Sequence, residues 1–171
     1  MKVLIVVDMQ KDFIDGALGS KAAQAIVQNV KSKIEERRAS GYNIIFTRDT
    51  HGEDYLNTQE GRKLPVPHCI KGSEGWQIIS ELDVKPEDVI FDKPTFGSLK
   101  LADYLATINP GKVEFIGVCT DICVISNAMV TKAKLPEAEL WVDASCCAGV
   151  TPESHNNALK AMECCHINIL S

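Results

Sequence analysis

Short apolar runs alternate with amphipathic stretches along this chain. Residues 2–7 form a continuous, mostly β-branched run, which is typical of a central parallel strand buried on both faces. Further runs predict strands at 43–47, 89–91, 113–118, 139–142 and 167–170. Helical spacing predicts helices over about 20–40, 98–105, 122–132 and 151–164, with a short helix at 76–82. Residues 52–75 show no clear period and are expected to form a long loop.

This alternation of strands and helices predicts the fold class. It indicates an α/β protein with three layers, in which a mostly parallel central sheet is flanked by helices on both faces. The chain has 171 residues, of which 45% are hydrophobic, so we expect a single domain over 1–171. No Gly-rich dinucleotide fingerprint follows the first strand, and a nucleotide cofactor is therefore not expected.

Charge, apolar run length and cysteine content indicate which partners and which cellular location to expect. The net charge is −5 and there is no basic block, which argues against nucleic acid and against an anionic membrane surface. The longest apolar runs are too short to cross a bilayer or to serve as a signal peptide, so a cytoplasmic location is expected. Seven cysteines, an odd number with adjacent pairs at 146–147 and 164–165, suggest reduced thiols rather than a disulfide framework.

Polar side chains follow several of the predicted strands. Asp8 follows the first strand, Asp49 and His51 the second, Lys93 the third and Cys123 the fourth. Ligands bind at this edge of open parallel sheets, which predicts one site containing an acid, an amine and a thiol. Asp8 would take the thiol proton and Lys93 would stabilise the resulting charges. The alternatives are a loop cap for Asp8, a solvated amine for Lys93 and a small buried hydrophobe for Cys123.

The stretch 117–124 joins the fourth strand to a predicted helix. Thr120 and Asp121 are both good N-cap residue types, so Cys123 is expected in the first helical turn. Unpaired N–H groups and the helix dipole at that position favour a thiolate and could bind an oxyanion.

The long loop contains a second cluster of polar residues, with imidazole and carboxylate donors that suit a divalent metal. Its candidate ligands are Asp49, His51, Glu60 and His68. Glu53 and Asp54 compete with Glu60 for one ligand position. The alternative is a solvated acidic loop that contains two ordinary histidines.

Five motifs cover nearly the whole chain: VVDMQKDF at 6–13, FTRDTH at 46–51, PHCIKG at 67–72, DKPTF at 92–96 and GVCTDICV at 117–124. With these motifs the sequence resembles the isochorismatase-like cysteine hydrolases, and within them the nicotinamidases. The resemblance implies a catalytic triad of Asp8, Lys93 and Cys123. It also implies a cis peptide before Cys119, which directs the N–H groups of Cys119 and Cys123 at one oxyanion.

The resemblance further implies that Asp49, His51, Glu60 and His68 hold a divalent metal, with zinc as first choice and iron or manganese as alternatives. Phe13 and Phe96 are the expected aromatic walls for the substrate. The chain departs from nicotinamidases at Pro65, where these enzymes usually carry an aromatic residue that stacks on the pyridine ring. A homo-oligomer, either a dimer or a tetramer, is expected.

The activity implied is hydrolysis of a small carboxamide through a cysteine thioester, with nicotinamide converted to nicotinate and ammonia. Pro65 supports an alternative in which a metal-independent family hydrolase acts on another small amide or a ureido compound. A third hypothesis is a redox-sensing or ligand-binding module without turnover, and its support is the cysteine content.

Overall fold

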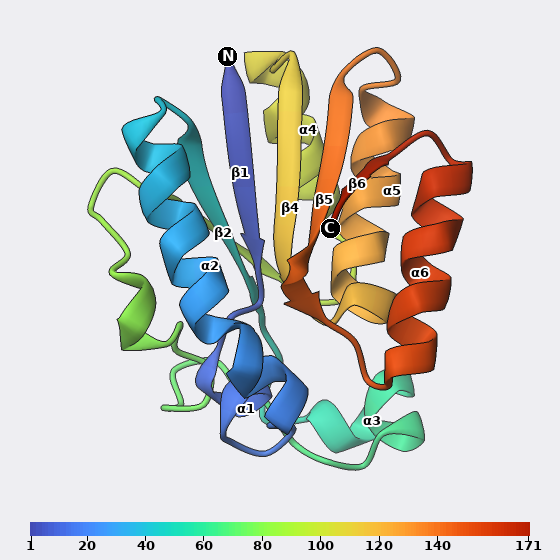
Figure 1. Cartoon of the computed structure of the whole chain (residues 1–171). Helices are drawn as coiled ribbons and strands as arrows, with labels where there is room; N and C mark the ends of the chain where they lie inside the picture. The colour runs from blue at the N-terminus through green and yellow to red at the C-terminus, as the bar shows by residue number, and fades with distance from the viewer.

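The computed structural model describes residues 1–171 and contains a six-stranded, fully parallel sheet (Figure 1). The strands are β1 Lys2–Val7, β2 Asn43–Asp49, β3 Val89–Lys93, β4 Lys112–Val118, β5 Glu139–Ala148 and β6 Asn168–Leu170. The helices are α1 Lys11–Ile14, α2 Lys21–Ala39, α3 Gln59–Lys63, α4 Leu99–Ile108, α5 Ile125–Lys134 and α6 Pro152–Cys164. The spatial order is β3-β2-β1-β4-β5-β6, so the chain reverses its winding direction between β1 and β4.

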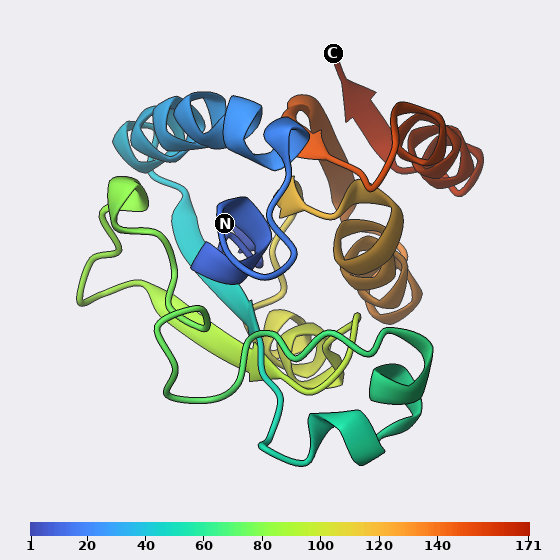
Figure 2. The same cartoon turned by 90° about the horizontal axis from the view of Figure 1, so that it is seen from below.

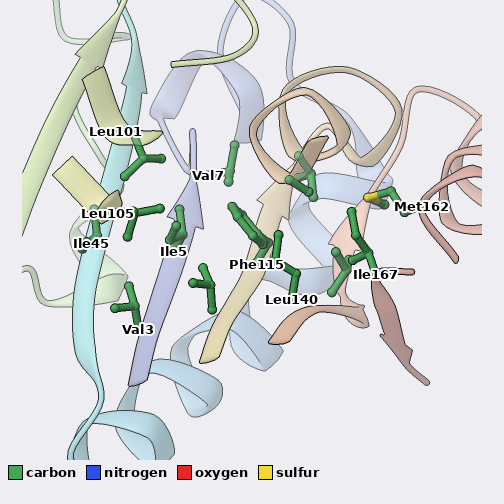
Figure 3. Packing of buried hydrophobic residues seen from close by; sticks show 14 of the residues in the cluster. Val3, Ile5, Val7, Ile45, Leu101, Leu105, Phe115, Leu140, Met162 and Ile167 are labelled. Atoms are coloured by element: carbon green, nitrogen blue, oxygen red, sulfur yellow. The ribbon is translucent and has the colours of Figure 1, made fainter. Parts of the chain in front are cut away.

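Helices cover both faces of the sheet, as the pattern predicts. Alternate residues of β1 point to opposite faces, with Val3 and Ile5 in one core and Leu4 and Val6 in the other. The Val3 core packs against α4, α5 and α6 (Figure 3). The Leu4 core packs against α2, the long helix on this face of the sheet (Figure 2), and also contains Ile14 of α1 and Leu82. The three-layer α/β prediction is confirmed.

Element boundaries differ from the prediction in several places. β5 continues six residues beyond Val142, although its second half is rich in small and polar residues. This half pairs with β4 after a register shift at Gly117, whose φ is +117° and whose added Cβ would lie 2.2 Å from the Val7 carbonyl oxygen. The helix predicted at 76–82 is wrong, since only Ser80–Leu82 forms a single 3₁₀ turn. The predicted 52–75 loop contains α3 and one 3₁₀ turn.

The segment after β4 also corrects the prediction. A π-turn at Thr120–Val124 precedes α5, which begins at Ile125 rather than at residue 122. Neither Thr120 nor Asp121 caps the helix. The Thr120 hydroxyl lies 2.7 Å from His155 Nδ1, and the Asp121 carboxylate accepts the Val150 N–H. Both side chains therefore join this turn to the start of α6.

A buried ion pair fixes α2 on the sheet. Glu114 of β4 is fully buried and accepts two hydrogen bonds from the Arg37 guanidinium, at 2.8 and 3.1 Å. Arg37→Met leaves this carboxylate without its cation, and we expect the free energy of unfolding in urea to fall by about 3 kcal/mol. Adding Glu114→Leu should recover most of the loss, because two apolar residues then replace the pair. A double variant as unstable as Arg37→Met would contradict this explanation.

No helix combines the length and the apolar character that a membrane span requires.

Candidate active site

The candidate site lies at the carboxyl edge of the sheet, where the winding direction reverses between β1 and β4. Asp8 follows β1 directly and adopts a left-handed backbone conformation, with φ at +49°. Its N–H donates to the Thr47 carbonyl at 3.2 Å, and the Thr47 hydroxyl donates to Asp8 Oδ1 at 2.6 Å. Thr47 of β2 therefore fixes both the backbone and one carboxylate oxygen of Asp8.

Lys93, the last residue of β3, brings the groups of the site together. Its side chain is fully buried, and Nζ lies 2.6 Å from Asp8 Oδ2 and 3.4 Å from Cys123 Sγ. The same ammonium donates to the Thr95 carbonyl at 3.1 Å and lies 3.4 Å from Asp49 Oδ1. The three residues of the predicted triad thus meet at a single buried cation.

Burial and charge determine the protonation state of the triad. Burial raises the pKa of Asp8, even though the neighbouring Lys93 charge opposes the shift. Burial and the Asp8 carboxylate raise the pKa of the Cys123 thiol well above its ordinary value. Burial alone would lower the pKa of Lys93, but Asp8, Cys123 and Asp49 together raise it. The Cys123 thiol is therefore protonated and Lys93 is charged at neutral pH, while the raised pKa of Asp8 makes its carboxylate a stronger base for the thiol proton.

The Cys123 turn, defined as Cys119–Val124, presents the thiol. The peptide bond before Cys119 is cis, as the resemblance implies. The N–H groups of Ile122 and Val124 both donate to the Cys119 carbonyl, while the Cys119 N–H donates to no other group of the protein. Asn127 Nδ2 holds the Cys123 carbonyl at 2.8 Å. The turn therefore keeps the Cys119 N–H available as a donor, four residues before the thiol in the chain.

The second predicted cluster also assembles. Asp49, His51, Glu60 and His68 each offer one donor atom, and these atoms all lie within 4.8 Å of one another. The His68 Nδ1–H donates to the Val66 carbonyl at 2.8 Å, which leaves Nε2 as a free ligand atom facing the two carboxylates. Two imidazole nitrogens and two carboxylate oxygens fit zinc, iron or manganese. The residues present therefore suit a divalent metal.

Electrostatics also favour a cation at this cluster. Burial alone would raise the pKa of Asp49, but hydrogen bonds from His51 and His68 and the Lys93 charge hold it well below its usual range. Asp49 is therefore ionised at neutral pH, with Oδ1 directed to Lys93 and Oδ2 to the histidines.

The structure distinguishes Glu60 from its competitors, because Glu53 and Asp54 are exposed and lie outside the cluster. We expect Glu60→Gln to weaken zinc binding by about 10- to 100-fold and Glu53→Gln to leave it unchanged. Isothermal titration of zinc into the metal-free protein checks this. Equal losses in the two variants would contradict the assignment of Glu60.

A cavity of about 330 Å³ opens above both clusters. Cys119, Cys123 and His68 contribute to its polar side, and Phe13 and Phe96 are apolar walls, as expected. The departure predicted at position 65 needs correction, since exposed Pro65 is not part of the lining and Leu64 is.

Two further residues organise the site without having been assigned a role from sequence. Gln10 is fully buried; its amide donates to the Asp49 and Trp76 carbonyls and accepts the Asp49 N–H. The Asn127 side chain joins the Cys123 carbonyl to the Phe96 carbonyl and the Ser98 N–H. Asn127 stands four residues after Cys123, so a polar residue at helical spacing from the thiol is the signal that identifies it.

Comparison with known proteins identifies relatives of this chain. Residues 2–171 match the isochorismatase domain. The chain belongs to the isochorismatase family. The nicotinamidase/pyrazinamidase of Mycobacterium tuberculosis is 24% identical to it over 99% of this chain and 98% of its own length. The zinc complex of the pyrazinamidase of Pyrococcus horikoshii superposes with a TM-score of 0.88 at 29% identity, covering 99% and 98% of the two chains.

A different activity occurs within the same family. The ureidoacrylate amidohydrolase RutB of Cronobacter sakazakii is 24% identical to this isochorismatase-family chain over 72% of the chain and 65% of its own length. The named activities of these relatives are hydrolyses of amide-type C–N bonds, on different substrates.

Proposed function

We propose that this protein is a cysteine amidohydrolase of the isochorismatase family that acts on small, neutral carboxamides, with nicotinamide as the first candidate. The observation that carries the proposal is the meeting of Asp8, Cys123 and Lys93 in one buried contact set beside an apolar cavity. A carboxylate and a thiol in such contact can exchange a proton, which the neutral thiol needs before it can attack.

In the proposed mechanism, Asp8 accepts the thiol proton and the sulfur of Cys123 attacks the carboxamide carbon. The negative oxygen of the tetrahedral intermediate is stabilised by the backbone N–H groups of Cys119 and Cys123. Asp8 then returns the proton to the amine, ammonia departs and a thioester remains on Cys123. Asp8 next removes a proton from water, which attacks the thioester. The C–S bond then breaks, the acid is released and Asp8 returns its proton to the sulfur of Cys123. Lys93 stays charged throughout and offsets the negative charge on Asp8 and on sulfur.

The metal cluster adds a binding function to this scheme. Asp49, His51, Glu60 and His68 would hold a divalent cation, which supplies a Lewis-acid position for a substrate lone pair such as that of a ring nitrogen. Asp49 and His68 also line the cavity, so a ligand on that side lies between the cluster and Cys123. Zinc is the first candidate, on the basis of the donor set.

The cavity lining favours a neutral substrate over an anionic one. Its sixteen residues include no lysine or arginine, but they include Asp49 and Glu60. A substrate carboxylate would therefore find no lysine or arginine in the lining to pair with, since the two acidic residues of the lining are assigned to the metal. This observation supports a neutral aromatic carboxamide and argues against a ureido acid such as ureidoacrylate.

Ammonia release from nicotinamide, pyrazinamide and ureidoacrylate tests the proposal. Each assay uses purified protein as prepared, after chelation and after zinc add-back. We expect turnover of the two aromatic amides that is lost on chelation and recovered with zinc, and no turnover of ureidoacrylate. Release from ureidoacrylate alone would overturn the substrate assignment, and retention of full activity after complete metal removal would overturn the role of the cluster.

Leu64, and not the neighbouring Pro65, is the residue of this segment that lines the cavity. Its carbonyl accepts a hydrogen bond from the Tyr55 hydroxyl at 2.9 Å, so the backbone at this position is fixed. We expect Leu64→Phe to lower the KM for nicotinamide by about 2- to 10-fold, because a stacked aromatic pair contributes about 0.5–1.5 kcal/mol. The matched variant Pro65→Phe should leave KM unchanged. Improvement in Pro65→Phe but not in Leu64→Phe would contradict this placement of the wall.

A further inference from the structure

We propose that His155 is a positioning residue for the reaction: through Thr120 it fixes the orientation of the Cys123 turn, and with it the N–H group that receives the oxyanion. This inference rests on the proposed amidohydrolase function and goes beyond it, because His155 belongs to neither the triad nor the metal cluster.

The contact that carries the inference lies directly beside the oxyanion donor. Thr120 is fully buried, and its hydroxyl is 2.7 Å from Nδ1 of His155, a half-buried residue of α6. Thr120 follows Cys119, whose N–H is free. A rotation of the peptide units around Thr120 would therefore change the direction of that N–H relative to Cys123 Sγ.

The backbone hydrogen bonds inside the turn do not tie its Cys119 end to another element. Ile122 and Val124 both donate to the same carbonyl, that of Cys119, so these two bonds stay within the turn. Asn127 fixes the opposite end of the turn, at the Cys123 carbonyl, and itself belongs to α5. The side-chain bond from Thr120 to His155 therefore ties the Cys119 end of the turn to a different element, the helix α6.

The start of α6 is well suited to serve as a fixed support. Thr151 and Ser154 form a reciprocal capping box, and Pro152 occupies the first helical position. Gly149 permits close packing of His155 on the end of β5, because an added Cβ there would lie 2.8 Å from the His155 Cβ. The Val150 N–H also donates to both Asp121 carboxylate oxygens at 3.2 Å, which gives a second link between the same two segments.

His155 acts through Thr120 rather than on the substrate. It is not among the residues that line the cavity, whereas Gly149 and Val150 on the same segment are. Its contribution should therefore appear in the stabilisation of the tetrahedral intermediate and not in the binding of the intact amide.

Three variants test this assignment. His155→Leu and Thr120→Val remove the bond from either side. His155→Asn places an amide group near the position of Nδ1, and this group can donate or accept as the hydroxyl requires. Asn157→Leu, at an exposed position on the same helix, is the matched control. Thermal unfolding of every variant shows whether it is folded at the assay temperature.

The readouts are kcat and KM for nicotinamide and the dissociation constant of pyridine-3-carbaldehyde. The aldehyde probes the same geometry without turnover: the Cys123 thiol adds across its C=O bond, the S–C bond forms and the oxygen enters the oxyanion position. For His155→Leu and Thr120→Val we expect kcat to fall and the aldehyde dissociation constant to rise by a similar factor, about 10- to 100-fold, with KM nearly unchanged. His155→Asn should recover most of both quantities, and Asn157→Leu should match the wild type.

The possible failures are distinguishable. Wild-type protein that neither hydrolyses nicotinamide nor binds the aldehyde would contradict the proposed function, and the inference with it. An active wild type with kcat and aldehyde affinity retained in folded His155→Leu and Thr120→Val would overturn the inference alone. Loss confined to KM, or no recovery in His155→Asn, would also overturn it, since neither follows from an oriented oxyanion donor.

Discussion

Replacing Cys123 with alanine is expected to lower kcat for nicotinamide by at least about 10⁴-fold, the scale seen when a nucleophile is removed from a covalent enzyme. The side chain is buried with its sulfur 3.4 Å from Lys93 Nζ, and no other thiol in the chain contacts this ammonium. The cavity contains a second thiol, that of Cys119, but the thiol hydrogen-bonded to Lys93 is that of Cys123. We therefore do not expect Cys119 to replace Cys123 as the nucleophile.

Ammonia release by the purified variant checks this result. Cys164→Ala, which removes an exposed thiol at the end of α6, is the control and should retain full activity. Zinc content should be the same in both variants, because Cys123 does not belong to the metal cluster. Substantial turnover by Cys123→Ala would rule out the thioester route.

Asp8→Asn is expected to lower kcat by about 10³- to 10⁴-fold while preserving the fold and the metal site. The amide has nearly the shape of the carboxylate and can still accept the Thr47 hydroxyl. It cannot take a proton from a thiol that burial keeps protonated, and it leaves the Lys93 ammonium without its closest counter-ion. Both the attack by sulfur and the hydrolysis of the thioester should slow.

The pre-steady-state time course separates the two effects of Asp8→Asn. If Asp8 serves both half-reactions, ammonia release should slow without a burst. The control is Asp15→Asn, an exposed carboxylate near α1. A variant that releases one equivalent of ammonia rapidly and then stalls would show that Asp8 acts only in the second step, contrary to the mechanism.

Local patterns of apolar and polar residues were sufficient to predict the α/β architecture and the edge of the sheet at which the candidate site lies. Parallel strands end at a common edge, so a polar residue directly after β1 or at the end of β3 is brought near its counterparts whatever the loops do. Asp8, Lys93 and Cys123 follow this rule, and their proximity could therefore be predicted without tertiary information.

Features that depend on tertiary contacts could not be predicted from local sequence patterns. The start of α5 was misplaced because Thr120 and Asp121 have the residue types of N-caps, yet His155 and Val150 engage their side chains instead. The second half of β5 carries weak strand signals, and it pairs with β4 after a register shift beside Gly117, which the local sequence does not reveal.

The residue that lines the substrate cavity after α3 was also not predictable from local sequence. A motif offset places the missing aromatic at Pro65, but the backbone after α3 turns Leu64 into the cavity instead. Gln10 is another case, since its role follows from bonds to Asp49 and Trp76, which are 39 and 66 residues away in sequence.

The measurement that tests the central claim most directly is the mass of the enzyme during turnover. Protein is mixed with saturating nicotinamide and quenched in acid within the first turnovers. It is then digested, and the mass of the peptide that contains Cys123 is measured by mass spectrometry. The proposed mechanism predicts a pyridine-3-carbonyl group bound to Cys123 through a thioester, absent from Cys123→Ala and released as nicotinate by base. An acyl group on a different residue, or sustained ammonia release by enzyme that never carries one, would contradict the mechanism.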